Sequence, residues 1–258
     1  MDRYLPSGLK PKKRFGQNFL VDARVVADLV ATANLKRSDV VVEVGAGTGV
    51  LTKELAKKAG KVIAFEIDRD LISLLKKELA GFSNVETINK DFLKVRPQQL
   101  NHLTVQPFKL VGSIPYQITS PLIHKLLTFK PRPSLVVLLI QKEVAEKITA
   151  KPPKATYLSN IVKLLGEAEI VRFISKTAFW PVPEVDGAII KLKVQNLKFK
   201  IDVENFQKFL HKGFQNPRKM LRNKFDPEVL KKVGIDPTQR AQELTLARWI
   251  HLFCELIS

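Results

Sequence analysis

The chain has 258 residues and a formal net charge of +18, because it carries 43 Lys and Arg residues against 25 Asp and Glu residues. Its apolar fraction of 45% is enough for a sizeable core, and its length allows one ordinary domain with a small second one. A surface this positive favours nucleic acid over a membrane as the partner, since no long amphipathic basic helix is visible. A basic surface without a specific partner is the alternative.

Features that the sequence lacks narrow the function further. Cys254 is the single cysteine, which excludes an intramolecular disulfide and is typical of a reducing compartment. The 4 histidines are scattered and have no cysteine companions, so no metal-binding pattern is present. Residues 1–15 contain no apolar run of signal-peptide length, and the longest apolar run, 135–140, is too short to span a membrane. We therefore expect a cytoplasmic protein that binds no metal.

Apolar runs and helical patterns alternate along the first part of the chain. The runs predict strands at 40–44, 61–65, 85–88, 109–111 and 135–140. Helices are predicted between the strands and at 142–149; Asp68 should cap one of them, and another should begin with Ser120 as N-cap and Pro121 as its first residue. This alternation indicates an α/β fold with a mostly parallel sheet that is covered on both faces and binds ligands beyond the carboxyl ends of its strands.

The pattern changes towards the C-terminus. Residues 167–173 and 187–194 predict two further strands, which could close the sheet as an antiparallel edge pair. From residue 202 onward only short helical patterns are visible, at 206–214, 220–225, 227–233 and 245–257. We therefore predict an α/β domain over residues 1–195 and a small all-helical domain over residues 196–258.

A glycine-rich segment, VEVGAGTG at 42–49, follows the first predicted strand and opens a helix. Its glycines let the backbone approach a ligand closely, and Glu66 at the end of the next strand is placed to accept hydrogen bonds from both hydroxyls of a ribose. A dinucleotide-binding loop needs Gly or Ala where Val50 stands. The segment instead resembles the first motif of class I (Rossmann-like) methyltransferases, with Gly45 and Gly47 beside the cofactor. A tight structural loop is the alternative.

Asp91 and Phe92 follow the third predicted strand and fit the same site. The carboxylate of Asp91 can accept a hydrogen bond from the amino group of an adenine, and the ring of Phe92 can lie beside the base. Taken alone, Phe92 is better explained as a core residue. Together with Glu66 these residues fit a cofactor that contains adenosine. The resemblance to class I methyltransferases implies that this cofactor has no phosphate and is S-adenosyl-L-methionine.

The tetrapeptide Ser113-Ile114-Pro115-Tyr116 follows the fourth predicted strand, above the expected position of the cofactor's methyl group. An adenine amine is a weak nucleophile because its lone pair is delocalised into the ring. The side-chain oxygen of Ser113 and the carbonyl of Ile114 could accept its N–H hydrogens and relocalise that lone pair, while Pro115 stiffens the loop. Tyr116 offers a face on which an extruded base can stack. A proline turn with a buried tyrosine is the alternative.

Phe179 is a second aromatic candidate, in the proline-rich sequence FWPVP at 179–183. It lies in the loop before the last predicted strand and could clamp the other face of the base. A packing residue in a proline-rich loop explains the same spacing equally well.

Nearly the whole chain resembles one family, the ribosomal RNA adenine N6,N6-dimethyltransferases. The sequence RFGQNFLVD at 14–22 looks like the opening motif of that family. The other motifs follow in family order at 43–49, 66–71, 91–93, 141–146, 179–186, 218–223 and 240–245. The last two are similar to the small-subunit branch, whereas enzymes that dimethylate large-subunit RNA and confer antibiotic resistance share mainly the early motifs.

The resemblance implies a function and adds two residues to the site. It implies that Asn18 and Leu20 touch the cofactor, together with Gly45, Glu66 and Asp91. It also implies dimethylation of two adjacent adenines in a hairpin near the 3′ end of small-subunit rRNA, during ribosome biogenesis. We therefore expect an rRNA-modifying enzyme that acts as a monomer on an immature ribosomal subunit.

Three positions depart from the family pattern. Ser113 stands where the family usually has Asn, Trp180 replaces a small or polar residue, and Pro217 replaces the first arginine of a basic run. Ser113 predicts a slower enzyme and is the feature that favours an alternative function, an inactive RNA-binding assembly factor. A large-subunit methylase and a dinucleotide-dependent oxidoreductase are further alternatives, which the C-terminal motifs and Val50 respectively oppose.

Two basic stretches are predicted to bind RNA phosphates. Residues 195–225 contain eight basic side chains against two acidic ones, and Arg218, Lys219 and Arg222 are the candidates among them for RNA contacts. Residues 1–14 add a second stretch: Arg3, Lys10, Lys12, Lys13 and Arg14. A solvated helical surface without RNA is the alternative.

Overall fold

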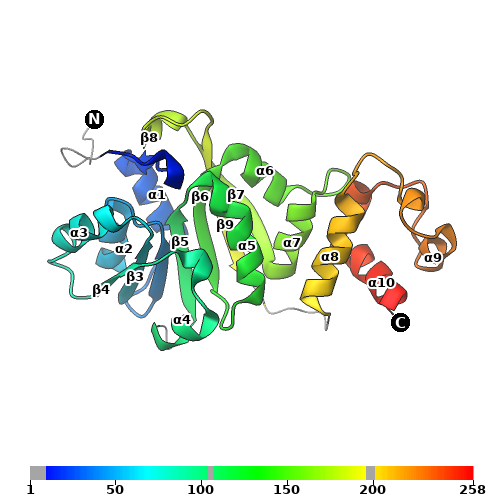
Figure 1. The fold of residues 1–258 in the computed structure, drawn as a ribbon, viewed down its shortest axis with the longest axis horizontal. Coiled ribbons are helices and arrows are strands. Elements are labelled where there is room, and N and C mark those ends of the chain that lie inside the picture. Colours follow the sequence, from blue (N-terminus) through cyan, green and yellow to red (C-terminus); the bar gives the residue numbers. More distant parts are fainter. Residues whose placement is uncertain (1–9, 104–106, 196–200, 258) are drawn as a thin grey trace. The chain divides into compact units, whose positions relative to one another are not determined.

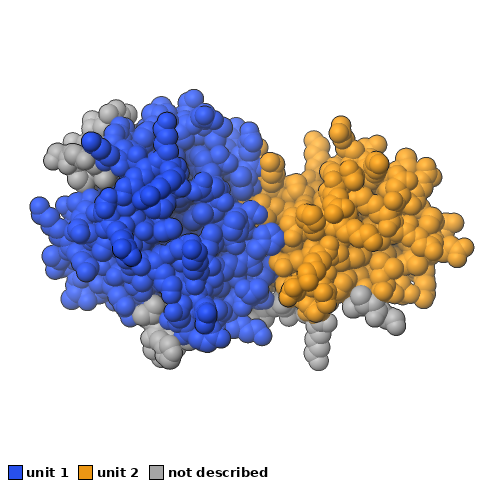
Figure 2. All heavy atoms as spheres, in the orientation of Figure 1, with its two compact units in different colours: residues 1–145, 169–194 blue, residues 146–168, 195–258 orange. Residues whose placement is uncertain are grey.

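The computed structural model describes residues 10–103, 107–195 and 201–257. The chain divides into two compact units, one of residues 1–145 and 169–194 and the other of residues 146–168 and 195–258 (Figure 2). The sequence-based division put its single boundary at residue 195. In the structure the segment 146–168 also belongs to the second unit, because its helix α7 (Tyr157–Leu165) packs on helices of that unit.

A seven-stranded sheet forms the centre of the first unit, in the order β4-β3-β2-β5-β6-β9-β7 (Figure 1). Its strands are β2 (Val40–Val44), β3 (Lys61–Glu66), β4 (Val85–Asn89), β5 (Phe108–Ser113), β6 (Leu135–Gln141), β7 (Gly166–Ile174) and β9 (Gly187–Val194). The first five are parallel, as predicted, and β9 runs antiparallel to β6. The later strand β9 lies inside the sheet and β7 takes the edge.

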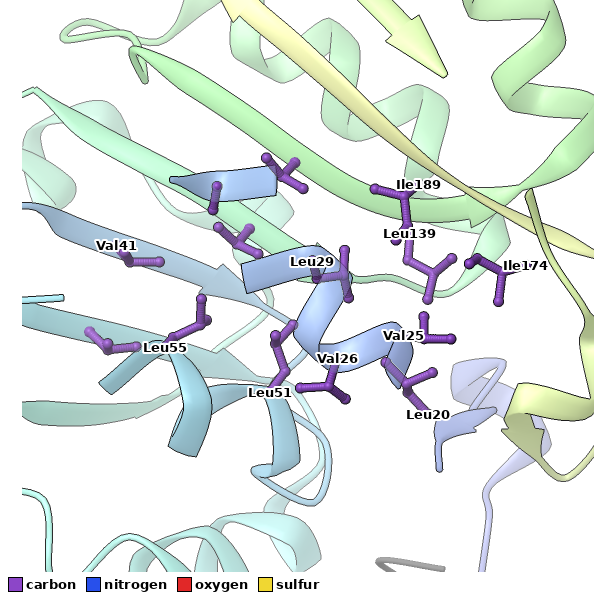
Figure 3. Packing of buried hydrophobic residues seen from close by; sticks show 14 of the residues in the cluster. Leu20, Val25, Val26, Leu29, Val41, Leu51, Leu55, Leu139, Ile174 and Ile189 are labelled. Atoms are coloured by element: carbon purple, nitrogen blue, oxygen red, sulfur yellow. The ribbon is translucent and has the colours of Figure 1, made fainter. Parts of the chain in front are cut away.

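Helices cover both faces of this sheet. They are α1 (Ala23–Ala33), α2 (Val50–Lys58), α3 (Arg69–Glu78), α4 (Pro97–Leu103) and α5 (Thr119–Thr128). Helix α6 (Lys142–Thr149) follows β6, and the boundary between the two units falls within it. Leu29 of α1 and Leu55 of α2 are fully buried against Val41, Leu139 and Ile189 of the sheet (Figure 3). The side chain of Asp68 caps α3, as predicted.

The predicted start of α5 is wrong by two residues. A 3₁₀ turn, Tyr116–Ile118, runs directly into the helix, so Ile118 is the N-cap and Ser120 and Pro121 lie in the first turn. Proline is tolerated there because the first N–H groups of a helix have no partner within the helix.

A small second sheet joins two distant segments of the first unit. Its strands are β1 (Phe19–Leu20) and β8 (Phe179–Trp180), which pair antiparallel with Leu20 opposite Phe179. The N–H of Val21 extends the pairing by donating to the carbonyl of Ala178 at 2.8 Å. This pairing holds the N-terminal motif beside the proline-rich loop.

The second unit is helical and has an aromatic core. Besides α7 it contains α8 (Val203–Phe214), α9 (Pro227–Lys232) and α10 (Leu246–Ile257). Residues 220–225, predicted as a helix, form only a 3₁₀ turn at Leu221–Asn223, because Met220 instead bridges to Arg240. The ring of Trp249 packs so closely on Gly213 that a β-carbon there would lie 2.4 Å from it. No helix among the described residues is long and apolar enough to cross a membrane.

Candidate active site

One pocket at the carboxyl ends of the parallel strands brings together nearly all of the predicted site residues. Its lining includes Asn18, Gly45, Gly47, Glu66, Asp91, Phe92, Ser113, Ile114, Pro115, Tyr116 and Phe179. Leu20 is the exception, since its side chain is only 8% exposed and packs into the core cluster behind β1. The loops after β2, β3, β4 and β5 therefore meet at one place, with β1 and β8 completing the wall.

The glycine-rich loop after β2 has a backbone that only glycine adopts readily. Gly45 and Gly47 have positive φ angles of 78° and 58°. The N–H groups of Gly45 and Ala46 both donate to the carbonyl of Phe65, at 2.9 and 3.0 Å. This conformation leaves the loop without side chains at the two positions where it lines the pocket.

The carboxylate of Glu66 is fixed by two backbone hydrogen bonds. The N–H of Gly47 donates to Oε2 at 2.9 Å and the N–H of Asp68 donates to Oε1 at 2.8 Å. Burial raises the pKa of Glu66, and these hydrogen bonds oppose that rise. Each carboxylate oxygen keeps further acceptor capacity, so the group can still bind a pair of hydroxyl donors.

The turn after β4 has a similar arrangement. Asp91 caps the 3₁₀ turn Phe92–Lys94, because its Oδ1 accepts from the N–H of Leu93 at 2.9 Å. The ring of Phe92 is only 4% exposed and packs edge-on against Phe65 at 5.2 Å and stacked on Phe129 at 5.9 Å. Phe92 therefore lines the pocket mainly as a core residue, which supports the turn that carries Asp91.

An N-terminal strap, residues 12–18, lies across the start of α3. The Nζ of Lys12 donates to Asp68 at 2.6 Å and to Asp70 at 2.5 Å, and the Nε2 of Gln17 donates to Asp68 at 2.8 Å. Burial acts to raise the pKa of Asp68, but the hydrogen bonds from Lys12 and Gln17 outweigh it and the pKa is lowered. Gln17 also lines the pocket, and sequence reasoning missed it although it stands inside the 14–22 motif.

The tetrapeptide at the end of β5 faces the same pocket. The N–H of Ile114 donates to the carbonyl of Leu139 at 3.3 Å, and the N–H of Ile118 donates to that of Pro115 at 3.1 Å, so the loop is held at both ends. The hydroxyl of Ser113 makes no hydrogen bond with another described residue. The hydroxyl of Tyr116 is buried and also lacks a partner among them, and burial, followed by the charge of Asp186, raises the pKa of Tyr116.

Phe179 is more deeply buried than an open base-binding platform would be. It is 4% exposed and belongs to the core cluster. The tip of its ring packs over Gly187, where an added β-carbon would lie 3.6 Å from it. Its ring still lines the pocket. The contact with a base therefore stays a prediction, and the packing role is visible in the structure.

The predicted RNA-binding residues lie in the second unit. Arg218, Lys219 and Arg222 are exposed, and no ion pair is present for them in the described parts of the chain. Backbone hydrogen bonds from Leu221 to Gln239 (2.8 Å) and from Arg222 to Pro237 (3.0 Å) fix the segment that carries them. Other predicted basic residues, Arg3, Lys198 and Lys200, lie outside the described residues.

Two lysines of the same stretch are already engaged. Lys224 donates to the carbonyls of Lys212 and Gly213 at 3.0 and 2.8 Å, at the C-terminus of α8. Lys208 pairs with Glu204 at 2.8 Å. These two lysines stabilise α8, so Arg218, Lys219 and Arg222 are the better candidates for phosphate contacts.

Comparison with known proteins decides the family. The family model described as ribosomal RNA adenine dimethylase matches residues 8–258. The chain belongs to the ribosomal RNA adenine dimethylase family. It is 40% identical over 248 residues to the ribosomal RNA small subunit methyltransferase A of Thermotoga maritima, covering 95% of this chain and 85% of that protein. It is 38% identical over 259 residues to the same enzyme of Dehalococcoides mccartyi, covering 96% and 89%.

Solved structures of this adenine dimethylase family and of a related enzyme share the fold. A dimethyladenosine transferase from Plasmodium falciparum is 28% identical with a TM-score of 0.80, covering 93% of this chain and 97% of that one. The 23S rRNA methyltransferase ErmE is 30% identical with a TM-score of 0.74, covering 93% and 100%. The Rossmann-like methyltransferase fold predicted from the sequence is therefore confirmed.

The pocket fits the methyl donor that adenine dimethylases use, S-adenosylmethionine. Glu66 and Asp91 are two carboxylates held by backbone N–H groups, of the kind that can accept hydrogen bonds from ribose hydroxyls and from an adenine amino group. The glycine loop offers a surface without side chains at Gly45 and Gly47, and it lies next to the tetrapeptide: a β-carbon on Gly45 would be 3.7 Å from the carbonyl oxygen of Ser113. Among the described residues no group of three or more His, Cys, Asp or Glu side chains could hold a metal ion.

Proposed function

We propose that this chain transfers methyl groups from S-adenosylmethionine to the N6 amines of two adjacent adenines in a hairpin near the 3′ end of small-subunit rRNA. The observation that carries this proposal is the single pocket that joins Glu66 and Asp91 with the tetrapeptide 113–116. The relatives named small subunit methyltransferase A, at 38–40% identity over nearly the whole chain, support the small subunit as the target.

The tetrapeptide supplies what amine methylation needs from the protein. The Oγ of Ser113 and the carbonyl of Ile114 accept the two N–H hydrogens of the adenine amine, which turns its lone pair towards the methyl donor. S-adenosylmethionine supplies a methyl group on a positively charged sulfur. As the new N–C bond forms, the S–C bond breaks and the amine nitrogen then loses a proton to water. Tyr116 stacks on the extruded base, and Phe179 closes the opposite side.

The proposal extends to the setting of the reaction. The substrate is the rRNA of an immature ribosomal subunit, in which the hairpin is still accessible, and the enzyme acts as a monomer in the cytoplasm. Arg218, Lys219 and Arg222 bind phosphates of the same RNA, because they are exposed cations on a segment fixed by backbone hydrogen bonds.

Methylation of large-subunit rRNA is the second candidate, and the similarity to ErmE favours it. The identity to ErmE is 30%, below the 38–40% to the small-subunit enzymes. A third candidate, an inactive assembly factor, is supported by Ser113 alone.

One experiment separates the three candidates. The protein is incubated with S-adenosylmethionine that carries a tritiated methyl group and with either immature small subunits or unmodified large-subunit RNA, and labelled nucleotides are mapped. We expect label at two adjacent adenines of the small-subunit hairpin. Label only on the large-subunit RNA would replace the proposal by the second candidate. Binding of immature subunits without any label would support the assembly factor.

A further inference from the structure

Lys125 connects α5 to the turn that carries Asp91. Its Nζ donates to the carbonyl of Leu93 at 2.9 Å and lies 5.0 Å from the centre of the Phe129 ring. Phe129 in turn stacks on Phe92, the first residue of the same turn, at 5.9 Å. Lys125 therefore contacts this turn in two ways. Its ammonium group binds a backbone carbonyl of the turn, and it also lies over Phe129, which stacks on Phe92 of the turn.

This lysine is partly buried and close to the carboxylate. Burial lowers the pKa of Lys125, while the negative charge of Asp91 opposes that change. A charged ammonium group is retained in a partly buried position only when it has acceptors nearby. The Leu93 carbonyl provides a direct acceptor, and the negative charge of Asp91 also favours the ammonium group. Asp91 Oδ1 in turn accepts from the N–H of the same Leu93.

Helix α5 also begins at the catalytic loop. The 3₁₀ turn Tyr116–Ile118 continues into Thr119, the first residue of the helix. At 1.5 Å per residue, Lys125 lies about 9 Å along the helix from Thr119. A rigid helix of this length therefore joins the tetrapeptide to the turn that carries Asp91.

We propose that Lys125 is a positioning residue for the cofactor: it holds the turn 91–94 against α5 and so keeps the carboxylate of Asp91 where the adenine amino group binds. Lys125 itself touches no cofactor atom in this role, since it acts through the Leu93 carbonyl and the packing of Phe129 on Phe92. This inference rests on the proposed function in one respect, the placement of the cofactor's adenine at Asp91.

The first test is Lys125→Met, which keeps the aliphatic stem over Phe129 but removes the charge and the donor. We expect S-adenosylmethionine to bind about tenfold more weakly by calorimetry, equivalent to about 1.4 kcal/mol. The rate at saturating cofactor should stay within about twofold of the unmodified protein, because the tetrapeptide is untouched. Lys125→Arg, which restores a donor, should recover most of the affinity. Lys94→Met, in the same turn but exposed, is the matched control and should change nothing.

A double-mutant cycle with Asp91→Ala separates positioning from general destabilisation. If Lys125 acts through Asp91, then Lys125→Met should weaken binding no further once Asp91→Ala is present. An additional tenfold loss in that background, or unchanged affinity of Lys125→Met alone, would overturn the proposal. If Asp91→Ala itself left the affinity unchanged while RNA was still methylated, the adenine placement and this role would fall, and the proposed function would stand.

Discussion

Glu43 is a carboxyl group without exposure to solvent, and its replacement by glutamine should change how stability depends on pH. It is 0% exposed on β2, and neither of its carboxylate oxygens has a hydrogen-bond partner among the described residues. Burial raises the pKa of Glu43 to about 8, with a smaller opposing effect of Thr52 and a further rise from the charge of Glu66. The folded protein therefore holds a proton on Glu43 at neutral pH, whereas the unfolded chain does not.

The size of the effect follows from the pKa difference. A rise from 4.5 to about 8 is about 3.5 units, and at 1.36 kcal/mol per unit this amounts to about 5 kcal/mol. Because the folded-state pKa is the higher one, this stability is fully present below pH 4.5 and is lost as the pH rises through 8. About three quarters of the loss falls between pH 5 and pH 8, so the unmodified protein should lose about 3.5 kcal/mol relative to Glu43→Gln over that range.

Urea unfolding followed by circular dichroism at a series of pH values measures this difference. The transition of the first unit is identified as the one that moves when S-adenosylhomocysteine is added, since ligand binding stabilises the unit that binds it. Glu78→Gln is the control. Its hydrogen bond with Lys53 lowers the pKa of Glu78, so the stability that it contributes is lost only as the pH falls below 4.5. The difference between Glu78→Gln and the unmodified protein should therefore stay constant from pH 5 to pH 8. A difference between Glu43→Gln and the unmodified protein that stays constant from pH 5 to pH 8 would refute the reasoning.

Three further predictions concern the cofactor, the RNA and the chemistry. Glu66→Ala should weaken S-adenosylmethionine binding by about 2 kcal/mol or more, because two ligand hydroxyls lose a buried ionised acceptor; calorimetry that finds equal affinity would remove Glu66 from the site. Reversing Arg218, Lys219 and Arg222 to Glu should flatten the salt dependence of RNA binding and leave cofactor affinity intact, and an unaltered slope would move the RNA site elsewhere. Ser113→Asn should raise the single-turnover rate on immature small subunits if the loop has room for the amide. Ser113→Ala should lower that rate by about one to two orders of magnitude, which corresponds to about 1–3 kcal/mol of activation free energy. An alanine variant as fast as the unmodified enzyme would leave the Ile114 carbonyl to hold the amine alone.

The parts of the fold that the sequence predicts are those with a local signal. The five parallel strands are apolar runs, and Glu66 and Asp91 stand at the ends of two of them, so their meeting follows from the parallel arrangement. The pairing of β1 with β8 has no such signal, because each strand has only two residues and they lie 159 residues apart along the chain, from 20 to 179. The contact of Lys12 with Asp68 was missed for the same reason.

Other differences arise where tertiary contacts outweigh local patterns. The helix α7 at 157–165 packs on α8 and therefore belongs to the second unit. The sequence-based division had that unit begin only at residue 196. The side chain of Leu20 packs in the core cluster, which no local pattern indicates because β1 has only two residues. Its contact with the cofactor stays a prediction. Lys125 has no motif of its own, so its role becomes visible only from its hydrogen bond to Leu93.

The order of the strands has a consequence for synthesis of the chain. Strand β8 pairs with β1 at residues 19–20 to complete the wall of the pocket, and β9 lies between β6 and β7 in the large sheet. Both sheets are therefore completed only by residues 179–194. During translation the first 170 residues leave the ribosome with an unfinished sheet and an open binding site. We therefore expect the pocket to be completed only when about three quarters of the chain has been made, since contacts between distant segments form last. Prematurely terminated products should be inactive for that reason, even when every residue of the glycine loop and the tetrapeptide is present.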